Sequence, residues 1–347
     1  MKAFVSLVVA SILAVSLSGC TPPMPPEVRV ALEEQSYQCV DGETTVQFPA
    51  SIADIAPDFA TALSDSCTGM SISTPADQAT AQIEISDNGS FQCQPFLTVP
   101  FAVDAAVIAV NDENIGSLNL DFKTAAAIFD GTISTWNDPQ IAALNPDVEM
   151  PATAISVFPT VQTAALASFQ GWAIQNGVTF SGKLLKSTQS VSAKDVEALG
   201  SGQIALLPYS INTQAAYLTA NIVPDAKHTA AQTIADSSGI ASAGTQWVAK
   251  ASATDVSLTL NAKLKPTPPE GSDVAPLPYQ AIYPATMALC GEDNLTTRAV
   301  ARFLLRQDSQ GSLGASNLLP LPEEIRIASI QPVAKGLPKV KITEPAQ

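Results

Sequence analysis

The chain has 347 residues and a formal net charge of −15 at pH 7, with 46% hydrophobic and 14% charged residues. This composition is typical of a folded globular protein, and the length is enough for two ordinary domains or one large one. Such an acidic chain without a basic cluster is a poor partner for nucleic acid or for anionic lipid surfaces.

Residues 1–19 are predicted to be a lipoprotein signal peptide. Lys2 precedes an apolar run that is too short for a comfortable membrane span, and small residues precede Cys20 in the sequence LSGC. We expect Cys20 to become the lipidated first residue of the mature chain. A plain signal peptide with an incidental cysteine is the alternative. Residues 20–36 then form an extended, proline-rich stalk.

The pattern beyond the stalk alternates between expected strands and helices, which favours an α/β protein with mostly parallel sheets. Strands are expected at 44–48, 69–73, 81–86, 105–111, 203–210 and 281–290. Helices are expected at 51–67, 122–129, 139–144, 163–177, 193–200 and 294–311. A looser region spans 221–271, with further elements expected at 245–251 and 255–263, and a proline-rich loop lies at 265–280.

The predicted helix 294–311 carries Arg298, Arg302 and Arg306 four residues apart, so they form one stripe. An anion-binding row is one interpretation. We expect instead that Val300, Phe303 and Leu304 form the buried face and that the arginines face solvent. The tail, 336–347, is expected to be loosely attached.

Signals for catalysis are scarce. His228 is the single histidine; it lies in a polar stretch and is expected to be exposed. No Gly-x-Ser-x-Gly elbow, dinucleotide fingerprint or phosphate-cradling Gly-rich loop is present. One histidine and oxidised cysteines make zinc improbable. The sequence therefore predicts no enzyme, no metal and no cofactor.

Four cysteines follow Cys20, namely Cys39, Cys67, Cys93 and Cys290. An even number in an exported protein favours two disulfides, and the spacings fit no compact metal motif. Three connectivities are open on this count. Cys39–Cys67 would close a local loop, and Cys93–Cys290 would join an early segment to a late one.

The most distinctive stretch is AIFDGTISTWNDPQIAALNP, residues 127–146. It reads as a helix that ends at Gly131, a turn anchored by Trp136, and a second helix capped by Asn137 or Asp138 with Pro139 at its first position. This stretch resembles one found in the second lobe of periplasmic or lipid-anchored phosphate-binding proteins of ABC importers. Other segments resemble that family in the same order: 47–59, 83–89, 101–111, 202–210, 282–290 and 318–322.

The resemblance implies a type II periplasmic-binding-protein-like fold, with an α/β lobe on each side of a ligand cleft and two crossover strands between them. The crossings are expected near 100–105 and 281–285. Lobe 1 would comprise 37–103 plus 283–335, and lobe 2 would comprise 104–282. A Cys93–Cys290 disulfide would brace the hinge side of lobe 1, which favours the pairing with Cys39–Cys67.

The ligand site implied by the resemblance combines backbone N–H groups, hydroxyls and a carboxylate that accepts the proton of hydrogen phosphate. Asp87 matches the carboxylate and Ser86 lies beside it. The other residues at matching positions are Gln47, Phe48, Ser73, Thr74 and Thr163.

The sequence departs from the family where the motif Arg-Ser-Asp-Gly-Ser-Gly-Thr should follow 154–158. Pro159 stands at the arginine position, Val161 at the aspartate position, and both glycines are missing. A Gly-Asn-x-Gly stretch is replaced by TQSVS at 188–192. Glycine allows backbone to approach an anion closely, so its loss bears on the ligand as much as the lost arginine.

Two functions follow. The first is a monomeric, lipid-anchored extracytoplasmic solute-binding protein that delivers phosphate or another small ligand, charged or uncharged, to an ABC permease. The second is a binding-protein fold that has lost its anion site and serves as a protein-interaction or sensor lipoprotein.

Overall fold

The computed structural model describes residues 36–159, 162–185, 199–268 and 272–338. The signal peptide, Cys20, the stalk, most of the helix predicted at 193–200, the TQSVS segment and nearly all of the tail lie outside these residues. Within the described segments, no helix is both long enough and apolar enough to cross a membrane.

The centre of the fold is a mixed sheet of eight strands in the order β2-β1-β3-β12-β4-β7-β6, with β8 paired to β4. Their bounds are β1 Gly42–Gln47, β2 Met70–Ser73, β3 Ile83–Ser86, β4 Pro95–Asn111, β6 Ser156–Val157, β7 Gln203–Pro208, β8 Leu218–Thr219 and β12 Ile282–Cys290. Two smaller sheets pair β10 (Trp247–Ala251) with β11 (Val256–Leu260) and β5 (Asn119–Leu120) with β9 (Asn221–Ile222).

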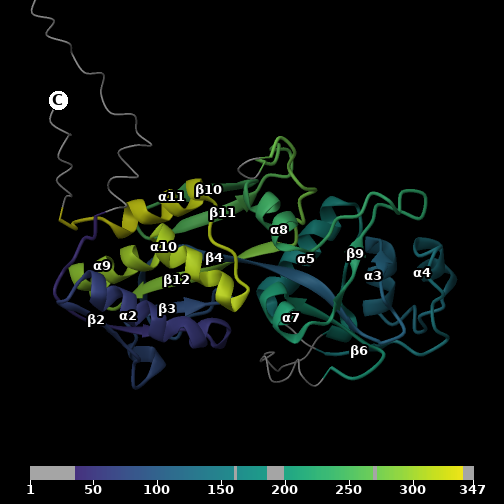
Figure 1. Cartoon of the computed structure of the whole chain (residues 1–347), viewed down its shortest axis with the longest axis horizontal. Helices are drawn as coiled ribbons and strands as arrows, with labels where there is room; N and C mark the ends of the chain where they lie inside the picture. The colour runs from purple at the N-terminus through teal and green to yellow at the C-terminus, as the bar shows by residue number, and fades with distance from the viewer. Residues whose placement is uncertain (1–35, 160–161, 186–198, 269–271, 339–347) are drawn as a thin grey trace, which may run out of the picture. The chain divides into compact units, whose positions relative to one another are not determined.

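The helices flank these sheets (Figure 1). The α-helices are α2 Ala56–Ser66, α3 Phe122–Phe129, α4 Pro139–Leu144, α5 Thr163–Gln175, α7 Tyr209–Ala215, α8 Ser237–Gly244, α9 Leu295–Leu304, α10 Gln307–Gly311 and α11 Glu323–Val333. The short 3-10 helices are η1 Ala50–Ile55, η2 Gln78–Thr80, η3 Lys183–Leu185 and η4 Ser312–Ser316.

Strand β4 connects two groups of strands. Its first part pairs with β12, with Pro95 opposite Cys290 and Ala105 opposite Ile282. Its last part, from Ala106 to Asn111, pairs with β7. In Figure 1, β4 runs from the group around β3 and β12 toward α7. Nearly the whole strand is buried, which explains its mostly apolar sequence.

The expected α/β class is correct, but the expectation of mostly parallel sheets is wrong. Parallel pairs are limited to β1 with β2, β1 with β3, β6 with β7 and β5 with β9 among the described residues. The long strands β4 and β12 pair antiparallel with each other, and each also has another antiparallel neighbour. Strands that pass between two groups return in the opposite direction, so their pairing is antiparallel.

The stretch 127–146 folds as its residues predict. Helix α3 ends before Gly131, which has φ +81°, a value that glycine adopts without strain. The Asp138 carboxylate accepts a 2.8 Å hydrogen bond from the Gln140 N–H and caps α4. Trp136, which lies between α3 and α4 in the sequence, is fully buried, as expected of an apolar anchor.

The predicted helix 294–311 is broken. Helix α9 ends at Leu304, and Arg306 has an extended backbone (φ −65°, ψ 155°) before α10 begins. Helices α7, α8 and α11 were not predicted. Short helices with weakly amphipathic sequences leave little periodic signal.

The expectation of a solvent-exposed arginine stripe is also wrong, because Arg298, Arg302 and Arg306 are all buried. Arg298 donates hydrogen bonds to the carbonyls of Pro332 and Val333 at 2.6 and 3.2 Å. Arg306 lies over the Tyr37 ring, with its guanidinium carbon 3.8 Å from the ring centroid. Arg298 thus joins the end of α11 to α9, and the three buried arginines form no open anion-binding row.

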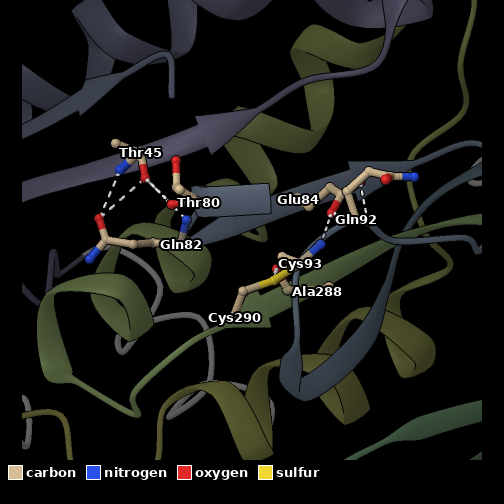
Figure 2. Close-up of a disulfide and its surroundings, with 8 residues drawn as sticks. All are labelled: Thr45, Thr80, Gln82, Glu84, Gln92, Cys93, Ala288 and Cys290. Carbon is tan, nitrogen blue, oxygen red and sulfur yellow. Dashed lines mark hydrogen bonds between the residues drawn. A yellow bond between two sulfur atoms is a disulfide. The ribbon is translucent and has the colours of Figure 1, made fainter. Parts of the chain in front are cut away.

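The structure pairs Cys39 with Cys67 and Cys93 with Cys290. Figure 2 shows Cys93, in the segment before β4, bonded to Cys290 at the end of β12. The buried carboxylate of Glu84 on β3 accepts hydrogen bonds from the N–H groups of Gln92 and Cys93 at 2.8 and 3.0 Å. The disulfide and this carboxylate together fix the turn that leads into β4.

Candidate functional site

The predicted lobe 1 site residues gather at one edge of the sheet. Strands β2, β1 and β3 are parallel neighbours, and they end at Ser73, Gln47 and Ser86. The carboxyl ends of parallel strands are the usual location of ligand sites in α/β proteins. Thr74, the next residue after β2, is exposed.

Two of these predicted residues are engaged locally. The Gln47 amide donates a 2.9 Å hydrogen bond to the carbonyl of Phe48. The Phe48 ring stacks on Phe59 of α2 with centroids 6.0 Å apart. Phe48 therefore closes the apolar layer under the strand ends.

Asp87 follows β3 at this edge and is held by a residue that sequence analysis missed. The Ser51 hydroxyl in η1 lies 3.0 and 2.9 Å from the two carboxylate oxygens of Asp87. Although part of the Asp87 side chain reaches solvent, burial raises its pKa to about 6, and the Ser51 hydrogen bond partly opposes this shift. The adjacent Ser86 hydroxyl donates to the Asn88 side chain at 2.9 Å.

A second carboxyl, Asp104, lies near Asp87 and was also missed. It is buried within β4 and accepts hydrogen bonds from the Ser210 hydroxyl at 2.6 Å and from the Ser210 N–H at 3.2 Å. Burial raises its pKa to about 7; hydrogen bonds from Ser210 and Ala105 lower it, and the charge of Asp87 raises it. Ser210 lies in the first turn of α7, so β4 and α7 share this site.

Tyr283 of β12 completes the cluster. It is directly opposite Asp104 in the β4–β12 pairing and is 5% exposed. Burial and the two nearby carboxyls raise the pKa of its hydroxyl well above the ordinary value. Although Asp104 is close enough to affect Tyr283, the hydroxyl makes no hydrogen bond of normal geometry with any described residue.

Helix α5 contacts the segment that leads into β12. The ring centroids of Trp172 in α5 and Tyr279 are 4.7 Å apart. The Ser168 hydroxyl of α5 donates a 3.1 Å hydrogen bond to the Ala281 carbonyl. The first turn of α5 begins at Thr163. Among the described residues, no side chain caps this end, and Thr163 is exposed.

The cluster of Asp87, Asp104 and Tyr283 combines hydroxyls with carboxyls whose pKa values are raised. Carboxyls of this kind can accept or share a ligand proton, and the N–H groups of a helix's first turn favour an anion. The described part of the chain holds no cluster of three or more His, Cys, Asp or Glu that could bind a metal ion. His228 is exposed, as expected, and its Nδ1 lies 2.8 Å from a carboxylate oxygen of Asp225. Neither residue belongs to the cluster of Asp87, Asp104 and Tyr283.

A cavity of about 560 Å³ lies between the start of α7, helix α8 and the segment around Leu319, and no residue of the cluster lines it. Its lining is mostly apolar and includes Tyr209, which precedes Ser210, and Leu319, whose backbone hydrogen-bonds to that of Val103. The cavity is large enough for a small organic molecule.

Comparison with known proteins gives one family model, the PBP superfamily domain, which matches residues 60–307. The phosphate-binding protein PstS2 of Mycobacterium bovis is 43% identical over 72 residues, 20% of each chain. The phosphate-binding protein PstS 3 of Mycobacterium leprae is 27% identical over 248 residues, which are 66% of this chain and 63% of that protein. The chain thus spans less than two thirds of the length of either relative.

Solved structures share the fold. The ancestral soluble variant of the human phosphate binding protein has a TM-score of 0.50 and 12% identity, covering 83% of this chain and 93% of that chain. A DING protein gives the same values. The expected two-lobe α/β architecture is confirmed by this agreement, and at such low identity the agreement concerns the fold alone.

Proposed function

Because a family model matches more than half of it, the chain belongs to the PBP superfamily, and we propose that it is a solute-binding protein of an ABC importer that holds phosphate in its cleft. The observation that carries the proposal is the cluster of Asp87, Asp104 and Tyr283, in which burial raises the pKa values of both carboxyls and of the tyrosine hydroxyl. We propose that the first turn of α5, which no side chain of the described residues caps, faces this cluster. We place lobe 1 at 37–103 plus 283–335 and lobe 2 at 104–282.

The relatives are named phosphate-binding proteins, and the chemistry of the site is compatible with phosphate. The N–H groups of α5 would hold its oxygens without a counter-charge, and the hydroxyls of Ser51 and Tyr283 would add donors. The Asp87 carboxylate would accept a ligand proton, which fully ionised sulfate cannot offer. Gln47, Phe48, Ser73, Thr74, Ser86 and Thr163 would form the rim of the site.

The proposal includes anchoring and delivery. Lipid on Cys20 would hold a monomer at the extracytoplasmic face of the cell membrane, and the residues of the stalk would keep the folded part free to meet an ABC permease. Opening and closing about β4 and β12 would admit and release the ligand. Neither a catalytic step nor a cofactor is required.

The second candidate is a protein-interaction or sensor lipoprotein. It is favoured by the apolar cavity beside Ser210 and by Val274 and Leu277, which are 74% and 56% exposed on the proline-rich loop. The same cavity would suit an uncharged ligand. A protein-interaction or sensor lipoprotein and a carrier of an uncharged ligand would both fail to bind phosphate.

The test is a thermal-shift series on the full chain in detergent, unfolded and refolded beforehand to remove any carried ligand. Phosphate, sulfate, sugars and amino acids are each added at rising concentration. A ligand at about a thousand times its dissociation constant adds roughly 4 kcal/mol to the free energy of unfolding. A shift with phosphate but not with sulfate supports the proposal, and no shift with phosphate at millimolar concentration refutes it.

A further inference from the structure

A second cavity, of about 490 Å³, lies between the start of α3, the end of α5 and the residues that follow β9. The segment that leads into β12 completes its walls, and no residue of the cluster of Asp87, Asp104 and Tyr283 lines it. Its volume is typical of a small-molecule site. Unlike the mostly apolar cavity beside α7, it is lined by charged groups of both signs, two carboxylates and one lysine.

Asp121 and Asp225 provide the two carboxylates. One oxygen of Asp121 caps α3 by accepting a 2.7 Å hydrogen bond from the Thr124 N–H. One oxygen of Asp225 accepts a 2.8 Å hydrogen bond from the Lys227 N–H and lies 2.8 Å from Nδ1 of His228. These contacts orient both side chains, and the second oxygen of each accepts no hydrogen bond from any described residue. Two oriented carboxylate oxygens are thus left for a donor in the cavity.

Lys123 and Trp172 provide donors in the same cavity. Lys123 is exposed, and its ammonium group forms no hydrogen bond or ion pair with the residues that the structure describes. The Trp172 side chain is 6% exposed, and the rings of Phe122 and Tyr279 hold it with centroids 4.9 and 4.7 Å away. Its indole N–H has no acceptor in the described segments and, unlike the N–H of Trp136, is not enclosed in the core. A buried, firmly packed side chain therefore leaves a polar atom for a ligand.

The other polar side chains of the cavity include two amides. The Asn176 amide donates a 2.9 Å hydrogen bond to the Trp172 carbonyl, and the Gln280 amide donates a 2.7 Å hydrogen bond to the side-chain oxygen of Gln246. These bonds use the nitrogen atoms and leave the side-chain oxygens of Asn176 and Gln280 as further acceptors. Apolar walls complete the cavity and include Phe122, Val178, Val223 and Pro278.

The charges of the lining determine which class of ligand fits. A simple anion would be repelled by Asp121 and Asp225. A simple cation would leave the Lys123 ammonium group and the Trp172 N–H without an acceptor. A ligand that carries an ammonium group and a carboxylate satisfies both sets of groups.

We propose that this cavity binds a small zwitterion of the α-amino-acid class. The ligand ammonium group donates to Asp121 and Asp225, and the ligand carboxylate accepts from Lys123 and the indole N–H of Trp172. An apolar ligand side chain packs against the apolar walls. The inference goes beyond the proposed function, because neither phosphate nor the Asp87 cluster takes part in it.

The first test varies the ligand. L-Leucine and L-phenylalanine are titrated by calorimetry at pH 7 into the full chain in detergent, after unfolding and refolding to remove any carried ligand. We expect saturable binding of at least one of them. Its N-acetyl derivative, which lacks the ammonium group, and its methyl ester, which lacks the carboxylate, should bind more weakly by on the order of tenfold. No binding of either amino acid at millimolar concentration, or equal affinity of the blocked derivatives, overturns the inference.

The second test assigns the binding to this cavity. Asp121→Asn removes a charge and keeps the cap of α3, because asparagine caps a helix about as well as aspartate. It should weaken amino-acid binding by on the order of tenfold, whereas Asp138→Asn, at the cap of α4 and outside the cavity, should not. Lys123→Gln should reduce the preference for the amino acid over its methyl ester, and the exposed Lys250→Gln should keep it.

Equal effects within these two pairs of variants would place the ligand elsewhere and overturn the inference. The titrations of the wild type with blocked derivatives need no variant, so they decide the question even if a variant does not fold. Phosphate has no part in either test, and a negative result therefore leaves the proposed function standing.

Discussion

The Ser210 hydroxyl donates a 2.6 Å hydrogen bond to Asp104, which is 106 residues earlier in the chain and on a different element. The Ser210 N–H donates to the other carboxylate oxygen at 3.2 Å. Ser210→Ala should lower the free energy of unfolding by about 1–3 kcal/mol, because a buried carboxyl loses its strongest donor. Urea denaturation measures this change. The exposed Ser71→Ala is the matched control, and equal effects of the two variants would contradict the account.

Asp104 and Asp87 should also make stability depend on pH. Burial raises both pKa values, to about 7 and about 6, so the folded state binds these protons more tightly than the unfolded chain. The sign follows directly: their contribution to stability falls as the pH rises from about 4 to about 7. Asp293, whose pKa is lowered by its hydrogen bonds to Arg298, titrates below this window.

Asp104→Asn should therefore stabilise the protein at pH 8, by on the order of 2–4 kcal/mol, and should flatten the profile between pH 5 and 8. The free energy of unfolding at several pH values provides the measurement. A variant that is less stable than the wild type at pH 8 would show that the ionised carboxyl is not destabilising.

Arg298 should matter for stability and not for ligand binding. Its guanidinium group is buried and satisfies the carbonyls of Pro332 and Val333 at the end of α11. Arg298→Ala should cost about 2–4 kcal/mol, whereas Asp293→Asn, which removes only the half-exposed partner of the ion pair, should cost less than about 1 kcal/mol. Chemical denaturation of both variants decides this, and a phosphate affinity that changes with Arg298→Ala would contradict it.

The two disulfides should differ in their contribution. Cys93–Cys290 spans 197 residues and Cys39–Cys67 spans 28, so the longer loop restricts the unfolded chain more. The double variant Cys93→Ser/Cys290→Ser should lose about 3–5 kcal/mol, and Cys39→Ser/Cys67→Ser about 2–4 kcal/mol. Thermal unfolding under oxidising conditions provides the comparison. A larger loss for the local disulfide would contradict the ranking.

The local elements were the predictable part of the fold. Gly131, Asp138 and Pro139 carry turn and cap signals that depend only on their neighbours, and the helices around them form as expected. The prediction that the arginine stripe is exposed to solvent was wrong because the burial of these side chains depends on tertiary contacts. Periodicity shows which face of a helix is apolar, but it does not show that α11 covers the opposite face and accepts hydrogen bonds from Arg298.

The candidate site was half predictable. Asp87 was found through a motif, because it follows a strand that resembles a known segment. Asp104 gave a signal that the sequence analysis did not use, because it is the single carboxylate in a mostly apolar strand. Ser51 and Ser210 left none, because a serine after a strand or in a short helix becomes a site residue only when the tertiary fold brings a carboxyl to it.

Phosphate binding at Asp87 is the property on which the proposed function depends most directly. We would measure the dissociation constant of phosphate for the refolded full chain and for Asp87→Ala by calorimetry at about pH 6. We expect saturable binding by the wild type, weakened by on the order of tenfold to a hundredfold in Asp87→Ala, because a charge-assisted hydrogen bond is lost. Equal affinities for the two proteins, or no phosphate binding by the wild type, would contradict it.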